Sequence, residues 1–229
     1  MGAAGESPAK FAQAILPPLP SGPGAEPSFA AKPYDAALKW FKNKNVVDKA
    51  TFESMSARAK RRAFTMAGNA TDEMMKVAHQ ELARQVAEGA DLRQFKKFVA
   101  ERLEKAGFTP ANPSHVETVF RTNVMNAYSA GRHAEMTQPA VLKARPYWQV
   151  LGVHDARTRE THAKVQGTSI PASDAGWHRA YPPFGYNCRC RVVSRSEADV
   201  KRLGLKIGSG ADLAALPDQG FDSGVHSLL

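Results

Sequence analysis

The sequence predicts an α+β fold, in which an N-terminal helical region is followed by a small, loop-rich region that contains short strands. Through residues 33–136, apolar side chains recur at the spacing of a helix face. Two later runs, residues 147–153 and 190–194, are rich in the β-branched and aromatic residues typical of strands. Between these runs Gly, Pro and Asp are frequent and no period persists, which predicts a long loop.

Residues 1–32 are expected to form a flexible arm, because they are rich in Pro and Gly and show almost no helix or strand pattern. Their one apolar stretch, Phe11 to Leu16, is followed at once by Pro17 and Pro18. It is too short for the apolar part of a secretory signal. No apolar run approaches the roughly 18 to 20 residues of a membrane helix. We therefore expect a protein that is made in the cytosol and has no membrane partner.

The helical region, residues 33–136, is expected to hold five helices that are bounded by capping residues or glycine. The first is short and begins near Pro33, and the others cover about residues 48–67, 71–88, 91–107 and 114–131. Two of them open on a capping-box pattern, Asp91 with Gln94 and Ser114 with Glu117. The last helix carries Asn123 beside its apolar face, where a buried amide requires a hydrogen-bond partner on a neighbouring helix.

The strands and the loop between them are expected to form a small region at residues 137–195. A peripheral C-terminal tail is expected to follow at residues 196–229. Within that tail, residues 196–203 predict a short helix, and the chain from Gly208 onwards predicts irregular structure.

The charge balance favours an anionic neighbour, since the formal net charge is +9 and the isoelectric point is about 9.7. The basic residues are spread along the chain, and their densest cluster is Arg58, Lys60, Arg61 and Arg62. A diffuse excess of this kind is more typical of a solvated surface than of a protein that reads a DNA sequence. It favours contact with double-stranded DNA through the phosphates, without base specificity. A dedicated DNA-binding module is an open alternative, and it would require strongly salt-dependent affinity for duplex DNA.

The segment from residue 154 to residue 190 gathers the side chains that could carry chemistry. Cys188 and Cys190, the two cysteines of the chain, are two residues apart and would point to the same face of an extended strand. With His162 they would offer three ligands that suit zinc, and a fourth could come from His154, Asp155 or His178. The alternative is a reduced pair of buried thiols beside a hydrogen-bonded histidine.

No catalytic residue is expected. Cys188 and His162 could in principle act as nucleophile and base, but no nucleophile signature lies beside either cysteine. Asp155 and Thr158 are expected to cap a helix, and Arg157 to pair with a carboxylate. Three aromatic residues are expected to serve packing: Trp148, Trp177 and Tyr186.

Several of these motifs together resemble the phage Mu protein F-like family of minor head, or head morphogenesis, proteins. The first group lies on the fifth expected helix and comprises Phe120-Arg121-Thr122-Asn123, Ala127-Tyr128 and Gly131-Arg132. The second group follows in order as Arg145-Pro146-Tyr147-Trp148, Asp155-Ala156-Arg157-Thr158, His162, Gly167, Trp177, Pro182-Pro183 and Cys188-Arg189-Cys190. The resemblance covers about residues 35 to 195.

The resemblance implies a structural protein of the virion, present in few copies in the capsid interior or at the portal vertex, and found in the host cytoplasm during assembly. It implies the portal protein, the major capsid protein or both as partners, and a role in head assembly or DNA packaging. The motif positions that it implies to be structural are Arg121, Asn123, Gly131, Arg132, Asp155, Arg157, Thr158, Trp177, Pro182 and Pro183.

Related head morphogenesis domains often carry five potential metal ligands in these motifs. Two of the corresponding positions hold Arg159 and Gly185 here, and a third holds His162 in place of cysteine. The resemblance therefore implies a folding role for the motif and no cofactor, with zinc at His162, Cys188 and Cys190 as the exception to test. The alternative function is a toxin-like or hydrolytic effector enzyme that uses Asp155, His162, Cys188 and Cys190.

Overall fold

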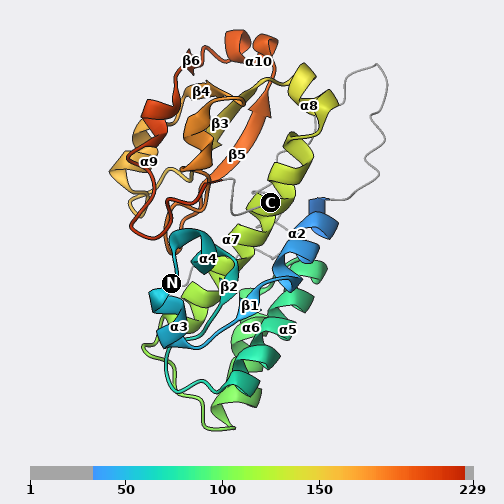
Figure 1. Ribbon diagram of the computed structural model, residues 1–229, viewed down its shortest axis with the longest axis vertical. Helices are drawn as coiled ribbons and strands as arrows, with labels where there is room; N and C mark the ends of the chain where they lie inside the picture. Colours follow the sequence, from blue (N-terminus) through green and yellow to red (C-terminus); the bar gives the residue numbers. More distant parts are fainter. Residues whose placement is uncertain (1–32, 225–229) are drawn as a thin grey trace, which may run out of the picture.

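The computed structural model describes residues 33–224, which form two lobes joined by one long helix, α7 (His115–Met136) (Figure 1). The N-terminal lobe, residues 33–127, is mainly helical, and the C-terminal lobe, residues 130–224, is built on a sheet. The α+β prediction is confirmed. The predicted arm at residues 1–32 lies outside the described residues. Within residues 33–224, none of the helices combines the length and apolar composition that crossing a bilayer needs.

The N-terminal lobe packs α2 (Pro33–Lys42) and α5 (Asp72–Glu88) against the first half of α7. The apolar faces of these helices meet in one core, whose fully buried members include Phe41, Leu82 and Phe95. The ends of α5 follow the predicted signals. Thr71 accepts a hydrogen bond from the backbone N–H of Met74, and Gly89 adopts a φ of 107°, which glycine reaches without steric cost.

The prediction of a single helix at residues 48–67 is wrong. The chain instead forms α3 (Lys49–Ser54) and α4 (Ala57–Arg61), which are followed by the short strand β2 (Ala63–Phe64). Met55 is extended, and Ser56 caps α4 by accepting from the N–H of Ala59, so the helix restarts there. β2 then pairs in parallel with β1 (Asn45–Val46), which takes its backbone groups out of any helix.

The fourth expected helix is divided into α6 (Leu92–Phe98) and a π-helical turn, Val99–Glu104. Asp91 caps it by accepting from the N–H groups of Arg93 and Gln94, but the N–H of Asp91 itself donates to Gln85. The reciprocal half of the expected capping box is therefore absent at this helix.

The fifth expected helix is α7, and both of its predicted ends need correction. Ser114 makes no side-chain capping bond, so the capping box expected with Glu117 does not form. Gly131 does not end the helix, which continues to Met136. Burial explains the continuation, since the last turns of α7 place His133 and Met136 inside the C-terminal lobe.

The C-terminal lobe contains a four-stranded sheet in the order β5-β3-β4-β6. The two predicted strands are present as β3 (Tyr147–Leu151) and β5 (Arg191–Arg195), and they pair antiparallel. The long loop expected between them holds α9 (Glu160–Lys164), β4 (Thr168–Pro171) and a 3-10 turn, Ala175–His178. The helix α8 (Pro139–Ala144) connects α7 to the sheet.

The tail expected to be peripheral forms part of the second core, which corrects that prediction. After α10 (Glu197–Arg202), the strand β6 (Lys206–Ile207) adds to the edge of β4 in parallel. A 3-10 turn, Gly210–Leu213, follows, and Leu213 and Leu216 are almost wholly buried. Isolated leucines among Gly, Pro and Asp form no periodic pattern in the sequence. Their burial follows from packing against the sheet and the second core, which the sequence pattern does not indicate. The region boundaries drawn from the sequence stay predictions, because α7 contributes to both cores.

Candidate functional site

The two groups of motif residues meet at the junction between the lobes. The loop that leads to the cysteines lies against α7, where the side chain of Asn187 donates to Thr118 Oγ1 at 3.0 Å. The backbone N–H of Asn187 donates to Thr122 Oγ1 at 3.3 Å. Asn187 has a φ of 56°, a left-handed conformation that asparagine tolerates better than most residues. The motif loop, residues 181–190, is thus held against the helix that carries the first group of motifs.

Arg61, at the end of α4, ties four segments together at this junction. Its Nε donates to Asn126 Oδ1 on α7 at 2.9 Å, and its two terminal nitrogens donate to the carbonyls of Tyr181, Pro182 and Gly224. The residue is buried, and desolvation lowers the pKa of Arg61 to about 10. One member of the basic cluster that we expected on a solvated surface is therefore an internal clamp.

A second buried group consists of His162, Cys188 and Cys190, whose potential ligand atoms all lie within 4.8 Å of one another. The imidazole Nδ1 of His162 lies 3.6 Å from Cys190 Sγ and 3.9 Å from Cys188 Sγ. Its Nε2 lies 3.0 Å from the carbonyl oxygen of Leu216. Because a carbonyl only accepts, Nε2 donates its N–H to Leu216, and Nδ1 faces the two sulfurs.

The two cysteines shift each other's pKa in opposite directions. Their hydrogen bond, together with His162, lowers the pKa of Cys188, whereas the same bond and burial raise the pKa of Cys190. Both cysteines are free of any disulfide. The group thus offers two cysteine sulfurs and one imidazole nitrogen, which is a donor set suited to a soft or borderline cation.

The arrangement matches one face of a zinc site. With Zn–S bonds of about 2.3 Å and Zn–N bonds of about 2.0 Å, tetrahedral ligand atoms lie roughly 3.5 to 3.8 Å apart. The structure does not bring the expected fourth ligands to this face. His154 and His178 are exposed and stand outside the group, and Asp155 is engaged elsewhere.

Asp155 anchors the turn that precedes α9. Its carboxylate forms a two-pronged ion pair with Arg189, at 2.6 and 2.5 Å, and Arg157 lies 3.7 Å away. This pairing holds the pKa of Asp155 well below its usual range. Asp155 also accepts from the N–H of Arg157, and the Thr158 hydroxyl donates to the carbonyl of Val153. Arg157 is therefore beside a carboxylate, as expected, but Arg189 is the stronger partner.

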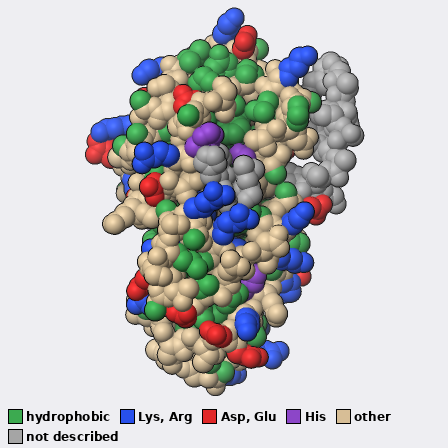
Figure 2. Space-filling model, in the orientation of Figure 1, with side chains coloured by type: hydrophobic (Ala, Val, Ile, Leu, Met, Phe, Trp, Pro, Cys, Tyr) green, Lys and Arg blue, Asp and Glu red, His purple; other side chains and the backbone are tan. Residues whose placement is uncertain are grey.

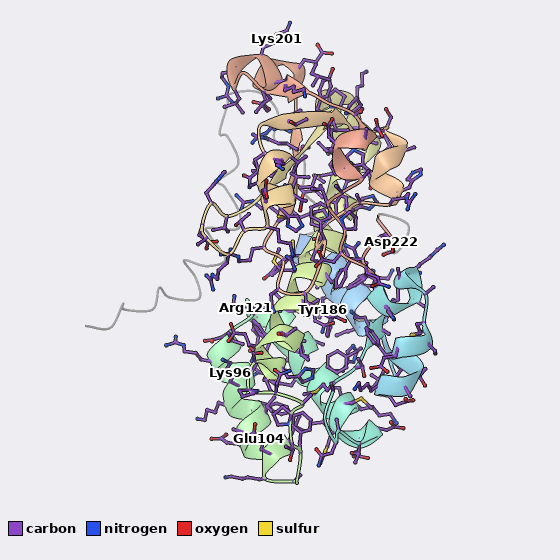
Figure 3. The ribbon with its side chains drawn as sticks, turned by 90° about the vertical axis from the view of Figure 1, so that its left-hand side faces the viewer. Lys96, Glu104, Arg121, Tyr186, Lys201 and Asp222 are labelled. Atoms are coloured by element: carbon purple, nitrogen blue, oxygen red, sulfur yellow. The ribbon has the colours of Figure 1, made fainter. Side chains whose placement is uncertain are left out.

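The aromatic motif residues differ in their surroundings. Trp177 is buried against Trp148 and Tyr181, and its indole N–H donates to the carbonyl of Pro171. Pro182 and Pro183 are buried beside them. Tyr186, expected to be a packing residue, is 51% exposed and touches Phe221 edge-on at the waist of the molecule (Figure 3).

The motif residues of α7 have mainly local contacts. Arg121 pairs with Glu117 at 2.7 Å, and Arg132 lies 3.9 Å from Glu135. Gly131 is buried within the helix. Asn123 is the exception, because it accepts a hydrogen bond from Lys44 Nζ at 2.8 Å while its own amide donates to the carbonyl of Val119. The partner expected for a buried amide is therefore a lysine that follows α2.

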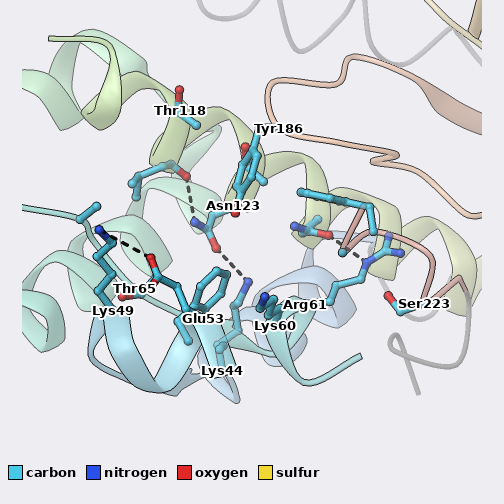
Figure 4. A pocket seen from close by; sticks show the side chains of 18 of the residues that line it. Lys44, Lys49, Glu53, Lys60, Arg61, Thr65, Thr118, Asn123, Tyr186 and Ser223 are labelled. Carbon is cyan, nitrogen blue, oxygen red and sulfur yellow. Dashed lines mark hydrogen bonds and ion pairs between the residues drawn. The ribbon is translucent and has the colours of Figure 1, made fainter. Parts of the chain in front are cut away.

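A cavity of about 420 Å³ opens between α3, α4, α7 and the motif loop (Figure 4). Lys44, Asn123 and Arg61 line its floor, and Tyr186 lies at its side. Sequence reasoning missed Lys44. One lysine among many near the end of a helix carries no signal, and its burial arises only when α7 packs across α2.

Lys44 is the least solvated ammonium group in this cavity. It is 7% exposed and lies over the rings of Trp40 and Phe41, at 5.0 and 5.9 Å from their centres. Burial, and secondarily the charge of Arg61, lowers the pKa of Lys44 to about 7. Burial of His133, and secondarily the charge of Arg61, likewise lowers the pKa of His133 to about 4.

Comparison with known proteins gives a consistent family match. The model of the family described as Phage Mu protein F like protein matches residues 76–193. The chain is 33% identical over 199 residues to the Putative capsid assembly protein F of Escherichia phage Mu, an alignment that covers 80% of this chain and 42% of that relative. It is 32% identical over 160 residues to the Mu-like prophage FluMu F protein of Haemophilus influenzae, covering 65% of this chain and 38% of the relative.

The chain thus spans less than half the length of these curated relatives. No solved structure matches it.

The lowered pKa of Lys44 predicts a specific pH dependence of stability. Between pH 7 and the ordinary value of 10.5, the unfolded chain keeps a proton that the folded chain releases, so the free energy of unfolding rises with pH. Relative to Lys44→Met, the wild-type protein should gain up to about 1.4 kcal/mol per pH unit in this window. Urea denaturation of both proteins from pH 6.5 to 9.5 measures the difference. Parallel curves, with Lys42→Met as the exposed control, would show that the Lys44 ammonium is not buried.

Proposed function

The chain belongs to the family of phage Mu protein F-like proteins, and on that premise we propose that it acts in the assembly of a phage head. The observation that carries the proposal is the identity shared with the Putative capsid assembly protein F of phage Mu along 80% of this chain. The order of the motifs from α7 to the Cys-Arg-Cys segment supports it, since the motif residues Thr122 and Pro182 take part in the contacts that join the two lobes.

The more specific role that we propose is a minor structural component of the head. In this role the chain contacts the portal protein, the major capsid protein or both, in the capsid interior or at the portal vertex. The net charge of +9 supports a position that faces packaged DNA. Lys and Arg side chains are spread over the face in Figure 2, with acidic side chains among them, which favours non-specific contact with phosphates.

The proposed role is structural and not catalytic. His162, Cys188 and Cys190 are each no more than 3% exposed, so a substrate has no path to either sulfur. The N–H of the imidazole is engaged by the carbonyl of Leu216, which fixes the ring as part of the packing. These observations favour the structural function over the effector enzyme that the same residues suggested in the sequence.

We further propose that the thiol–histidine group holds a structural zinc ion. Two thiolates and a neutral imidazole would neutralise the charge of Zn²⁺ in a buried site. The bond from Nε2 to the Leu216 carbonyl is the kind of outer contact that orients a metal-binding histidine. The fourth ligand would come from solvent or from the amide oxygen of Gln166. A flip of that amide would bring the oxygen to the place of the buried, unpartnered Nε2, which lies near Cys190 across Gly152.

The assembly role predicts that this chain is a constituent of phage heads. Mass spectrometry of purified heads should detect its peptides, at far fewer copies than the major capsid protein. The peptides should resist an added protease until the heads are opened. Absence of the chain from both immature and mature heads would contradict the proposal, with a tail protein of the same particles as the control for sample recovery.

The zinc proposal predicts about one zinc ion per chain in protein purified without added metal. Removal of the ion by a chelator should lower the melting temperature, because without the metal ion the thiols no longer connect the motif loop to His162 on α9. Metal analysis and thermal melts of the wild type, Cys188→Ser, His162→Ala and the exposed control His154→Ala provide the measurement. Only the first two variants should lose the ion.

The zinc proposal would be contradicted if wild-type protein purified without metal showed no change in melting temperature when zinc is added. A different result bears on the structural role. If Cys188→Ser and His162→Ala stayed folded but lost a measurable activity of the wild type, an effector enzyme would be the better interpretation of the site.

A further inference from the structure

The cavity at the junction carries a positive charge that the protein does not neutralise. Four basic side chains and one acidic side chain line it, a formal excess of three positive charges: Lys44, Lys49, Lys60 and Arg61 against Glu53. The one carboxylate is at the exposed rim, where it already pairs with Lys49 at 3.5 Å. The inner part of the cavity is therefore basic without a counter-charge among its lining residues.

Lys44 has N–H donors that no acceptor among the described residues of the cavity engages. An ammonium group has three N–H donors, and in the described part of the chain one acceptor, Asn123 Oδ1, engages it. No carboxylate of residues 33–224 forms an ion pair with it, although the side chain is buried. Arg61 differs, because four acceptors already surround its guanidinium. A buried cation without a charged partner is costly, which is why burial lowers the pKa of Lys44; a bound anion would supply the missing negative charge and keep the ammonium protonated.

The remaining lining indicates what kind of anion fits. Thr118 and Thr122 accept bonds from Asn187, which leaves their hydroxyl hydrogens available to donate. A phosphate monoester carries close to two negative charges at neutral pH and three acceptor oxygens, so it matches this excess of charge better than a single carboxylate does. Three aromatic rings also line the cavity. Lys60 Nζ lies over the ring of Phe52 at 5.7 Å, while Tyr186 and Phe221 offer aromatic surface to a flat apolar group.

We propose that this cavity binds a small phosphate monoester with a flat aromatic body, of the size of a nucleotide, with Lys44 as the charge partner of the phosphate. The volume of about 420 Å³ falls within the range of roughly 300 to 1,000 Å³ that small-molecule sites occupy. The aromatic body lies against Tyr186 and Phe221 at the rim, while the phosphate reaches the floor beside Asn123 (Figure 4).

The depth of Lys44 separates this ligand from packaged DNA. Lys44 is 7% exposed and its ammonium group lies over the rings of Trp40 and Phe41 within the cavity, so a phosphate within a rigid duplex cannot approach it. A terminal phosphate on a single nucleotide has no such restriction. The inference is independent of the proposed role in head assembly, since it concerns a cavity and not the particle.

Isothermal titration with adenosine 5′-monophosphate tests the proposal on the full chain at constant ionic strength. Adenosine, inorganic phosphate and a short blunt DNA duplex without terminal phosphates serve as comparison ligands. The monophosphate should bind, and adenosine should bind roughly tenfold or more weakly because a charge-assisted contact is lost. Inorganic phosphate should also be weaker, because it lacks the aromatic body.

Two variants locate the binding. Lys44→Met should weaken binding of the monophosphate roughly tenfold or more, whereas Lys42→Met, an exposed lysine just before it, should leave binding unchanged. Because Lys44→Met changes a buried position, the wild type alone supplies a second measurement. Adenosine 5′-monophosphate should raise its melting temperature above that measured with adenosine at the same ionic strength.

The proposal is overturned if the wild type shows no heat and no thermal shift with the monophosphate. It is equally overturned if both lysine variants bind like the wild type, or if the duplex binds as well as the monophosphate. Equal binding of inorganic phosphate and the monophosphate would overturn the assignment of the aromatic rim.

Discussion

The buried guanidinium of Arg61 is the interaction on which the arrangement of the two lobes depends. It bonds to α7 through Asn126 and to the backbone carbonyls of the motif loop and of Gly224, so four segments meet on one side chain. Its partners are neutral, so they accept from four of its five N–H groups but leave its charge in place. That charge is felt by its neighbours, since it contributes to the lowered pKa values of Lys44 and His133. The residue that joins the lobes therefore also makes the cavity beside it basic.

The family motifs acquire a physical meaning from this junction. On α7, the buried Thr122 and Asn123 contact the motif loop and Lys44, while the apolar side of the same helix serves both cores. Pro182 contributes a carbonyl to Arg61, and His162 reaches the carbonyl of Leu216. These motif residues thus fix one segment against another that is distant in sequence, whereas Arg121 and Arg132 pair locally on α7. Such long-range contacts are expected of a protein whose proposed role is to present a rigid surface to other head proteins.

The parts of the fold that the sequence predicts are those governed by local rules. The period of α5, its cap at Thr71 and its stop at Gly89, and the β-branched runs of β3 and β5, all depend on neighbours within a few residues. The failures are set by distant contacts. Pairing with β1 ends the helix expected through residue 67, and burial carries α7 past Gly131. The grouping of His162 with the cysteines could be anticipated from spacing, whereas the burial of Lys44 and Arg61 could not, because their sequence neighbours look like any basic surface.

Native-state hydrogen exchange of Arg61→Met, compared with the wild type, tests most directly whether this one side chain unites the lobes. Removal of the clamp leaves buried carbonyls unsatisfied, at a cost of about 1 to 3 kcal/mol for each affected group. The amides of the motif loop, residues 181–190, and of α7 around residues 118–126 should then lose protection together. If the motif loop opened while α7 kept its wild-type protection, or if neither segment changed, Arg61 would be a local contact and the account of a single cooperative junction would be contradicted.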